Sequence, residues 1–118
     1  MLMIYGIKNC STMKKAFDFL DHAGVAYVFF DYKKQAIDRK ILQSWIEKLG
    51  LDVVINKRGT TWRKLTDEQK NQAENTDMAI ALLQAQPSMI KRPIITNAAG
   101  EVLLVGFDAA AYQAILQT

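Results

Sequence analysis

Cys10, the one cysteine of the chain, is the side chain best suited to chemistry. It lies in the polar turn Ile7-Lys8-Asn9-Cys10-Ser11-Thr12, directly before a stretch with helical spacing. The N–H groups and the positive dipole end of a helix N-terminus stabilise a thiolate, and Lys8 and Lys14 would add positive charge nearby. A free cysteine is also commonly a small buried apolar residue, but such a residue usually lies inside a strand or on an apolar helix face. The polar turn therefore predicts a reactive thiolate at Cys10.

The lone cysteine also limits the chemistry. The run Cys10-Ser11-Thr12-Met13 has no second cysteine, so an intramolecular disulfide and a multi-cysteine zinc or iron–sulfur site are excluded, and we expect no metal site. A covalent intermediate on Cys10 must then be resolved by the thiol of another molecule. We expect glutathione in this role, as a co-substrate and not as a bound cofactor. We also expect neighbouring residues of the turn to bind glutathione or substrate: Lys8, Asn9, Ser11 and Thr12.

Two arginines are candidates for anion binding. Arg58 lies in a predicted loop over residues 56–64, and Arg92 precedes Pro93 at the start of a predicted strand. A guanidinium group suits carboxylates and oxyanions, although an isolated arginine is commonly a solvated surface residue. An Arg-Pro pair that enters a strand beside the thiol turn is the more suggestive of the two. Pro93 is a candidate cis proline, a form found in about 5–6% of X-Pro bonds in folded proteins.

The elements around Cys10 form a βαβ unit. Residues 2–6 are apolar with β character, residues 13–20 have helical spacing, and Gly24 is placed to end that helix. Residues 25–30 form the second predicted strand, and the short connection favours a parallel pair. His22 falls in the last turn of the helix, far from Cys10 and without a histidine partner, so we expect no metal or base role for it.

The rest of the chain reads as a helical insert followed by a hairpin and a last helix. Asp38 is placed to cap a helix that ends at Gly50, a polar helix follows from Thr66 or Asp67 to Glu74, and Asp77 is placed to cap a helix that Pro87 stops. Residues 93–96 and 101–105 predict an antiparallel hairpin, and Asp108 starts the last helix. The order predicts an α/β, thioredoxin-like fold: a mixed β-sheet flanked by helices, with a helical insertion in the middle of the chain.

Composition favours one domain over residues 1–118, because half of the residues are hydrophobic and 23% are charged. The net charge is +3, and the basic residues are spread along the chain, so we expect small anionic ligands or acidic partners, and no nucleic-acid partner. No run approaches the roughly 18 apolar residues of a membrane span, and no charged segment precedes the apolar start as in a signal peptide. A lone reduced cysteine fits the cytoplasm, which is the expected location.

Three segments carry a resemblance to a known family: Tyr5-Gly6-Ile7-Lys8-Asn9-Cys10-Ser11-Thr12-Met13-Lys14-Lys15-Ala16, Asn56-Lys57-Arg58-Gly59-Thr60-Thr61-Trp62-Arg63-Lys64-Leu65 and Lys91-Arg92-Pro93-Ile94-Ile95. With these segments the chain resembles the ArsC family, and most closely its YffB-like branch, which is related to the Spx regulators. The similarity runs nearly end to end. The resemblance implies a thioredoxin-like domain with a helical insert, a catalytic Cys10, and glutathione as the reductant. It also implies that Arg92, before a cis Pro93, binds an oxyanion or thiol substrate, and that Arg58 is a second anion-binding arginine.

Departures from the family pattern separate three functional hypotheses. Arsenate reductases carry a histidine where this chain has Gly6 and Ile7, and an arginine where it has Phe107. The preferred hypothesis is therefore a glutathione-dependent thiol reductase that acts on a small thiol, disulfide or oxyanion. Glutaredoxin is expected as a further partner. The first alternative is a non-enzymatic, Spx-like regulator that binds RNA polymerase, although Met13 interrupts the Cys-x-x-Cys of those proteins. The second alternative is an arsenate reductase coupled to glutathione and glutaredoxin.

Overall fold

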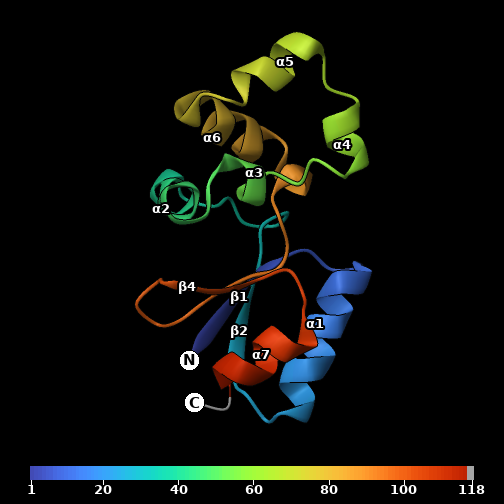
Figure 1. Cartoon of the computed structure of the whole chain (residues 1–118), viewed down its shortest axis with the longest axis vertical. Helices are drawn as coiled ribbons and strands as arrows, with labels where there is room; N and C mark the ends of the chain where they lie inside the picture. Colours follow the sequence, from blue (N-terminus) through green and yellow to red (C-terminus); the bar gives the residue numbers. More distant parts are fainter. Residues whose placement is uncertain (117–118) are drawn as a thin grey trace. The chain divides into compact units, whose positions relative to one another are not determined.

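A computed structural model describes residues 1–116 of the chain, which form two compact units (Figure 1). The first unit contains Met1–Tyr32 and residues 92–116, and the second is Lys33–Lys91. The single domain expected from composition stays a prediction. Among the described residues, no helix is both long and apolar enough to cross a membrane.

A four-stranded sheet forms the centre of the first unit. Its strands are β1 (Leu2–Gly6), β2 (Tyr27–Asp31), β3 (Ile94–Thr96) and β4 (Val102–Val105), in the order β2-β1-β3-β4. Strands β1 and β2 are parallel, whereas β3 is antiparallel to both β1 and β4. The predicted mixed sheet and the predicted hairpin are therefore confirmed.

Helices α1 (Ser11–His22) and α7 (Ala109–Leu116) pack on one face of this sheet (Figure 1). Ile4 pairs with Ile95, and Ile95 pairs with Leu104, so these three side chains form a row across that face. The rings of Phe19 and Tyr112 join the two helices edge to face at 5.6 Å. The row and the helices share one buried core, which also contains Met13, Ala16, Leu20 and Tyr112.

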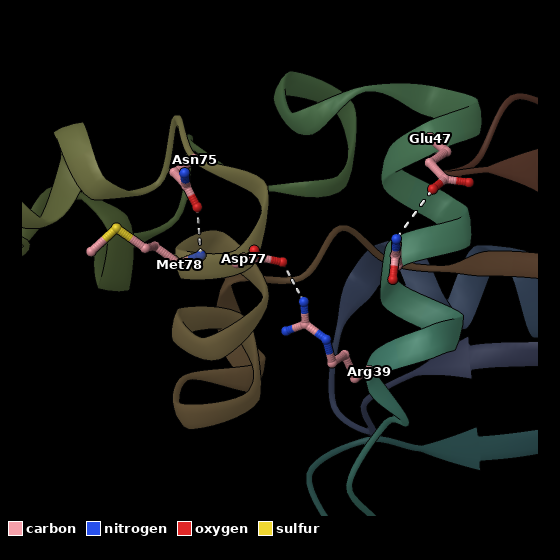
Figure 2. A network of polar contacts seen from close by, with 6 residues as sticks. Arg39, Glu47, Asn75, Asp77 and Met78 are labelled. Atoms are coloured by element: carbon pink, nitrogen blue, oxygen red, sulfur yellow. Dashed lines mark hydrogen bonds and ion pairs between the residues drawn. The ribbon is translucent and has the colours of Figure 1, made fainter.

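The second unit is helical. Its elements are α2 (Arg39–Leu49), α3 (Leu51–Val54), α4 (Thr60–Arg63), α5 (Asp67–Gln72), α6 (Thr76–Ala85) and the 3-10 helix η1 (Pro87–Met89). The predicted cap at Asp38 is confirmed, since its carboxylate accepts a hydrogen bond from the Lys40 N–H at 2.7 Å. Arg39 of α2 pairs with Asp77 of α6 on the surface (Figure 2). An exposed pair of this kind adds little stability, so apolar packing holds these helices together.

Two predictions about the insert are wrong. Residues 56–64, predicted as a loop, contain the short helix α4. Helix α6 is capped by Asn75 and not by Asp77, because the Asn75 side chain accepts from the Met78 N–H at 3.1 Å (Figure 2). Asparagine and aspartate cap helices about equally well, so the sequence alone did not separate these two neighbouring candidates.

Candidate active site

Cys10 lies at the N-cap of α1, as predicted, where the chain leaves β1 and turns into the helix. Asn9 supplies the turn: its φ of 60° lies in the left-handed region, which asparagine tolerates better than most residues. The Cys10 carbonyl accepts the first helical hydrogen bond, from the Lys14 N–H at 2.9 Å. The cysteine is free and only partly buried.

Close packing between Gly6 and Met13 fixes the start of α1 against the end of β1. A Cβ atom built on Gly6 would lie 2.3 Å from the Met13 sulfur, so a larger residue fits there only if the buried Met13 side chain moves. The Gly6 carbonyl accepts a hydrogen bond from the Tyr32 N–H at 3.0 Å, which continues the parallel pairing past the end of β2. The ends of β1 and β2 and the first turn of α1 are thus held as one piece.

Arg92, in the segment before β3, contacts the residues at the ends of β1 and β2. Because Ile94 pairs with Tyr5 in an antiparallel register, the chain before Ile94 runs on past the end of β1, toward the turn that carries Cys10. The Arg92 guanidinium donates hydrogen bonds to the Cys10 sulfur and to the Tyr32 hydroxyl. The Arg92–Pro93 peptide bond is cis, as the resemblance implies.

Four influences set the pKa of Cys10. Partial burial raises it, whereas the Met13 N–H, the Arg92 guanidinium and the Thr12 N–H lower it. The three lowering influences together are larger than the effect of burial. Hydrogen bonding from the two N–H groups favours the charged form of the thiol. The pKa of Cys10 therefore lies below its ordinary value, as expected of a nucleophilic cysteine.

Tyr32 is a component of the site that sequence analysis missed. It is only 2% exposed, and burial raises its pKa to about 12, although the hydrogen bond from Arg92 works in the opposite direction. The hydroxyl is therefore neutral at ordinary pH and accepts from the guanidinium. Its location directly after β2 was the available signal, because functional side chains gather beyond the carboxyl ends of parallel strands.

A hollow of about 480 Å³ opens beside Cys10, entirely within the first unit. We call it the thiol hollow. Three of the four predicted binding residues of the turn, Lys8, Asn9 and Ser11, line it, whereas Thr12 acts on Cys10 through its N–H. The full lining is Lys8, Asn9, Cys10, Ser11, Met13, Lys14, Phe17 and Asp18.

Arg58 belongs to the second unit. Its side chain is exposed, and its N–H donates to the Asn56 side chain at 3.2 Å. Its predicted role as a second anion-binding residue stays a prediction.

His22 lies in the last turn of α1, and its Nδ1 hydrogen-bonds with the Asp18 carbonyl at 2.8 Å. Within residues 1–116, no group of three or more His, Cys, Asp or Glu side chains is placed to hold a metal ion.

A mixed sheet in the order β2-β1-β3-β4, with a cysteine at the start of the first helix and a cis proline before β3, defines a thioredoxin-like protein. The chain belongs to the ArsC family, whose sequence profile matches residues 5–115, and to the YffB-like branch of that family. This membership supports an oxidoreductase with a thiol reductase-like role.

Known proteins resemble the chain over almost its whole length. An uncharacterized protein of Haemophilus influenzae is 40% identical over 114 residues, which is 97% of each chain. The solved structure of a protein named YffB has a TM-score of 0.89 and 48% identity, covering 98% of this chain and 99% of that chain. The solution structure of an arsenate reductase (ArsC) related protein from Brucella melitensis has a TM-score of 0.75 and 39% identity, over 99% of this chain and 95% of that chain.

Proposed function

We propose that the protein is a glutathione-dependent thiol reductase in which Cys10 is the nucleophile. The observation that carries the proposal is a single cysteine at a helix N-terminus whose sulfur accepts a hydrogen bond from Arg92. A thiolate stabilised in this way attacks sulfur at neutral pH. The absence of a second cysteine from the sequence means that an outside thiol must complete the cycle.

The cycle has two thiol–disulfide exchanges. The Cys10 thiolate attacks the glutathione sulfur of a mixed disulfide between glutathione and another thiol, the S–S bond breaks, and the other thiol leaves as a thiolate that takes up a proton. The thiolate of a second glutathione then attacks the glutathione sulfur bound to Cys10. Glutathione disulfide leaves and the Cys10 thiolate is restored. The cycle suits a reducing cytoplasm, and glutaredoxin would be an alternative source of the resolving thiol.

The polar groups of the site have separate roles in this cycle. Arg92 stabilises the Cys10 thiolate, both as the attacking group and as the leaving group of the second exchange. Backbone N–H groups of Thr12 and Met13 assist it. Lys8, Asn9 and Ser11 bind the substrate or glutathione beside the sulfur.

The first test is formation of the covalent intermediate. Incubation with glutathione disulfide, followed by intact mass measurement, should show one glutathione per chain, removed again by reduced glutathione. Cys10→Ser should show none and should lose turnover of the glutathione–mercaptoethanol mixed disulfide, followed as NADPH oxidation by coupled glutathione reductase. An unmodified wild-type protein without turnover would contradict the proposal.

We further propose that sulfur and not arsenate is the target. Phe107 stands where arsenate reductases carry an arginine, and its ring packs against Phe19 at 6.1 Å and Tyr112 at 4.9 Å. This position is therefore part of an aromatic cluster and offers no charge to an oxyanion. Arsenate should give little or no coupled NADPH oxidation under conditions in which the mixed disulfide is reduced; comparable rates would contradict this preference.

A further inference from the structure

The thiol hollow follows one face of α1 away from the sulfur. Cys10, Met13 or Lys14, and Phe17 recur at three- to four-residue spacing, so they lie above one another on the helix surface. Seven residues of helix correspond to about 10 Å along its axis. The hollow therefore has room for a group that extends about two helical turns from the sulfur, far more than a small oxyanion needs.

Phe17 gives the far end of the hollow a fixed aromatic surface. Its ring stacks on Tyr27 at 5.7 Å and meets Phe29 edge to face at 5.2 Å, so two side chains of β2 hold it in place. The ring is only partly buried, and its remaining surface lines the hollow. A preformed apolar surface of this kind binds an apolar group without the cost of ordering a mobile side chain.

Charges at the rim bias the hollow against cations. Lys14 and Asp18 form an exposed pair at 3.8 Å, whose charges offset one another. Lys8 adds a further positive charge beside the sulfur. A neutral or anionic group is therefore favoured over a cationic one.

We propose that the thiol hollow binds the leaving thiol of the substrate, and that this thiol carries a neutral or anionic aromatic or similarly apolar body. The inference rests on the proposed function and names its substrate class: mixed disulfides between glutathione and an apolar thiol. Glutathione, which is polar, is held at Arg92, and the apolar half of the substrate packs on Phe17. In the first exchange, the S–S bond breaks between the two halves, and the apolar thiolate takes up a proton as it leaves along the hollow.

Two matched substrates test this selectivity. One is the glutathione mixed disulfide of 2-phenylethanethiol, and the other is that of 2-mercaptoethanol; both leaving groups are alkyl thiols of similar acidity, so they differ mainly in the body that enters the hollow. The expected kcat/KM is about tenfold higher for the phenylethyl substrate. Burying roughly 50 Å² of its ring, at about 25 cal/mol per Å², would produce this factor.

Variants of the aromatic surface test its location. Phe17→Gln should bring the ratio of the two kcat/KM values close to one, and Phe17→Leu, which keeps an apolar side chain, should leave an intermediate ratio. The ratio is measured on one preparation, so a general loss of folded protein cancels. Phe19→Leu is the matched control, because Phe19 lies on the same helix but packs against Phe107 and Tyr112 outside the hollow; its ratio should match that of the wild type.

The outcomes separate this inference from the function on which it rests. Equal kcat/KM values for both substrates in the wild type would overturn the inference and leave the thiol reductase in place. A wild-type preference that Phe17→Gln keeps unchanged would also overturn it, because the preference would then arise elsewhere. If neither substrate is reduced and no adduct forms on Cys10, both the function and the inference fail.

Discussion

The surroundings of Arg92 in the first unit and of Arg58 in the second differ in how far along the chain their partners come from. Arg92 joins Cys10, from the turn after β1, to Tyr32, from the end of β2. The Arg58 segment makes a local contact, between its N–H and the Asn56 side chain, and the Arg58 side chain is exposed. Both arginines stand in segments that resemble the same family. The difference teaches that a sheet, by joining distant segments in a fixed register, can aim a charge at a reactive atom.

Substitution of the two arginines should give the largest difference in activity between the two units. Arg92→Met keeps an unbranched side chain but removes the charge and the donors, and we expect kcat/KM for the mixed disulfide to fall about a hundredfold, since loss of one preorganised donor commonly costs about 10²–10³. Arg58→Met should cost only about three- to fivefold, mainly through KM. Steady-state kinetics on both variants measure this. A larger loss at Arg58 than at Arg92 would reverse the assignment.

Substitution of one glycine in each unit should give the next largest difference, in the free energy of unfolding. A Cβ atom on Gly6 meets the buried Met13 side chain, so Gly6→Ala should lower the free energy of unfolding by about 2 kcal/mol, the range of overpacked cores. At Gly59 the nearest atom is the end of the Asn56 side chain at 3.3 Å, so Gly59→Ala should change stability by less than about 0.5 kcal/mol. Urea unfolding of both variants tests the pair. Equal losses would show that Gly6 and Met13 do not hold the start of α1.

Tyr32 should have a smaller effect that acts through Arg92. Tyr32→Phe removes the hydroxyl that accepts from the guanidinium, so Arg92 is less well oriented and the pKa of Cys10 should rise, with about a three- to tenfold loss of rate at neutral pH. The pH dependence of Cys10 alkylation measures the shift.

Tyr5→Phe is the matched control for this experiment. Tyr5 is also a buried tyrosine, but its hydroxyl interacts with Thr96 and not with Arg92. Its alkylation profile should coincide with that of the wild type. If Tyr32→Phe and Tyr5→Phe behave alike, Tyr32 has no special connection to the thiol.

The smallest expected effect is on stability as a function of pH. Because the folded-state pKa of Cys10 is lowered, the unfolded chain binds more protons between that pKa and the ordinary value of about 8.5. The stability that the thiolate contributes is therefore present above about pH 8.5 and is lost as the pH falls through the folded-state pKa. The difference in urea midpoint between wild type and Cys10→Ser, measured from pH 5 to pH 9, should change in this direction. A difference that stays constant with pH would contradict the lowered pKa.

Local sequence signals predicted most of the architecture. Apolar spacing located the helix after Cys10, β character located the strands of the mixed sheet, and the cap at Asp38 is confirmed. These features depend on contacts within a few residues, which a sequence displays directly. The choice between Asn75 and Asp77 as a cap, and helix α4 in a segment of polar residues, depend on packing that local patterns do not show.

The candidate site was predictable only in part, for the same reason. The placement of Cys10 follows from the turn and the helix behind it. The contacts of Arg92 with Cys10 and Tyr32 depend on the register of β1 with β2 and β3, which no local pattern reveals. Phe17 was predicted only as an apolar helix residue, and its exposed surface beside the sulfur required the fold.

The central claim is that the fold lowers the pKa of Cys10 below its ordinary value, and the ionisation of the thiol tests this directly. The thiolate absorbance near 240 nm is followed across a pH titration of wild type, with Cys10→Ser subtracted and Arg92→Met run in parallel. The account predicts a midpoint clearly below the ordinary thiol value of about 8.5 in the wild type, and a higher midpoint in Arg92→Met. A wild-type midpoint at or above 8.5, or one that Arg92→Met leaves unchanged, would contradict it.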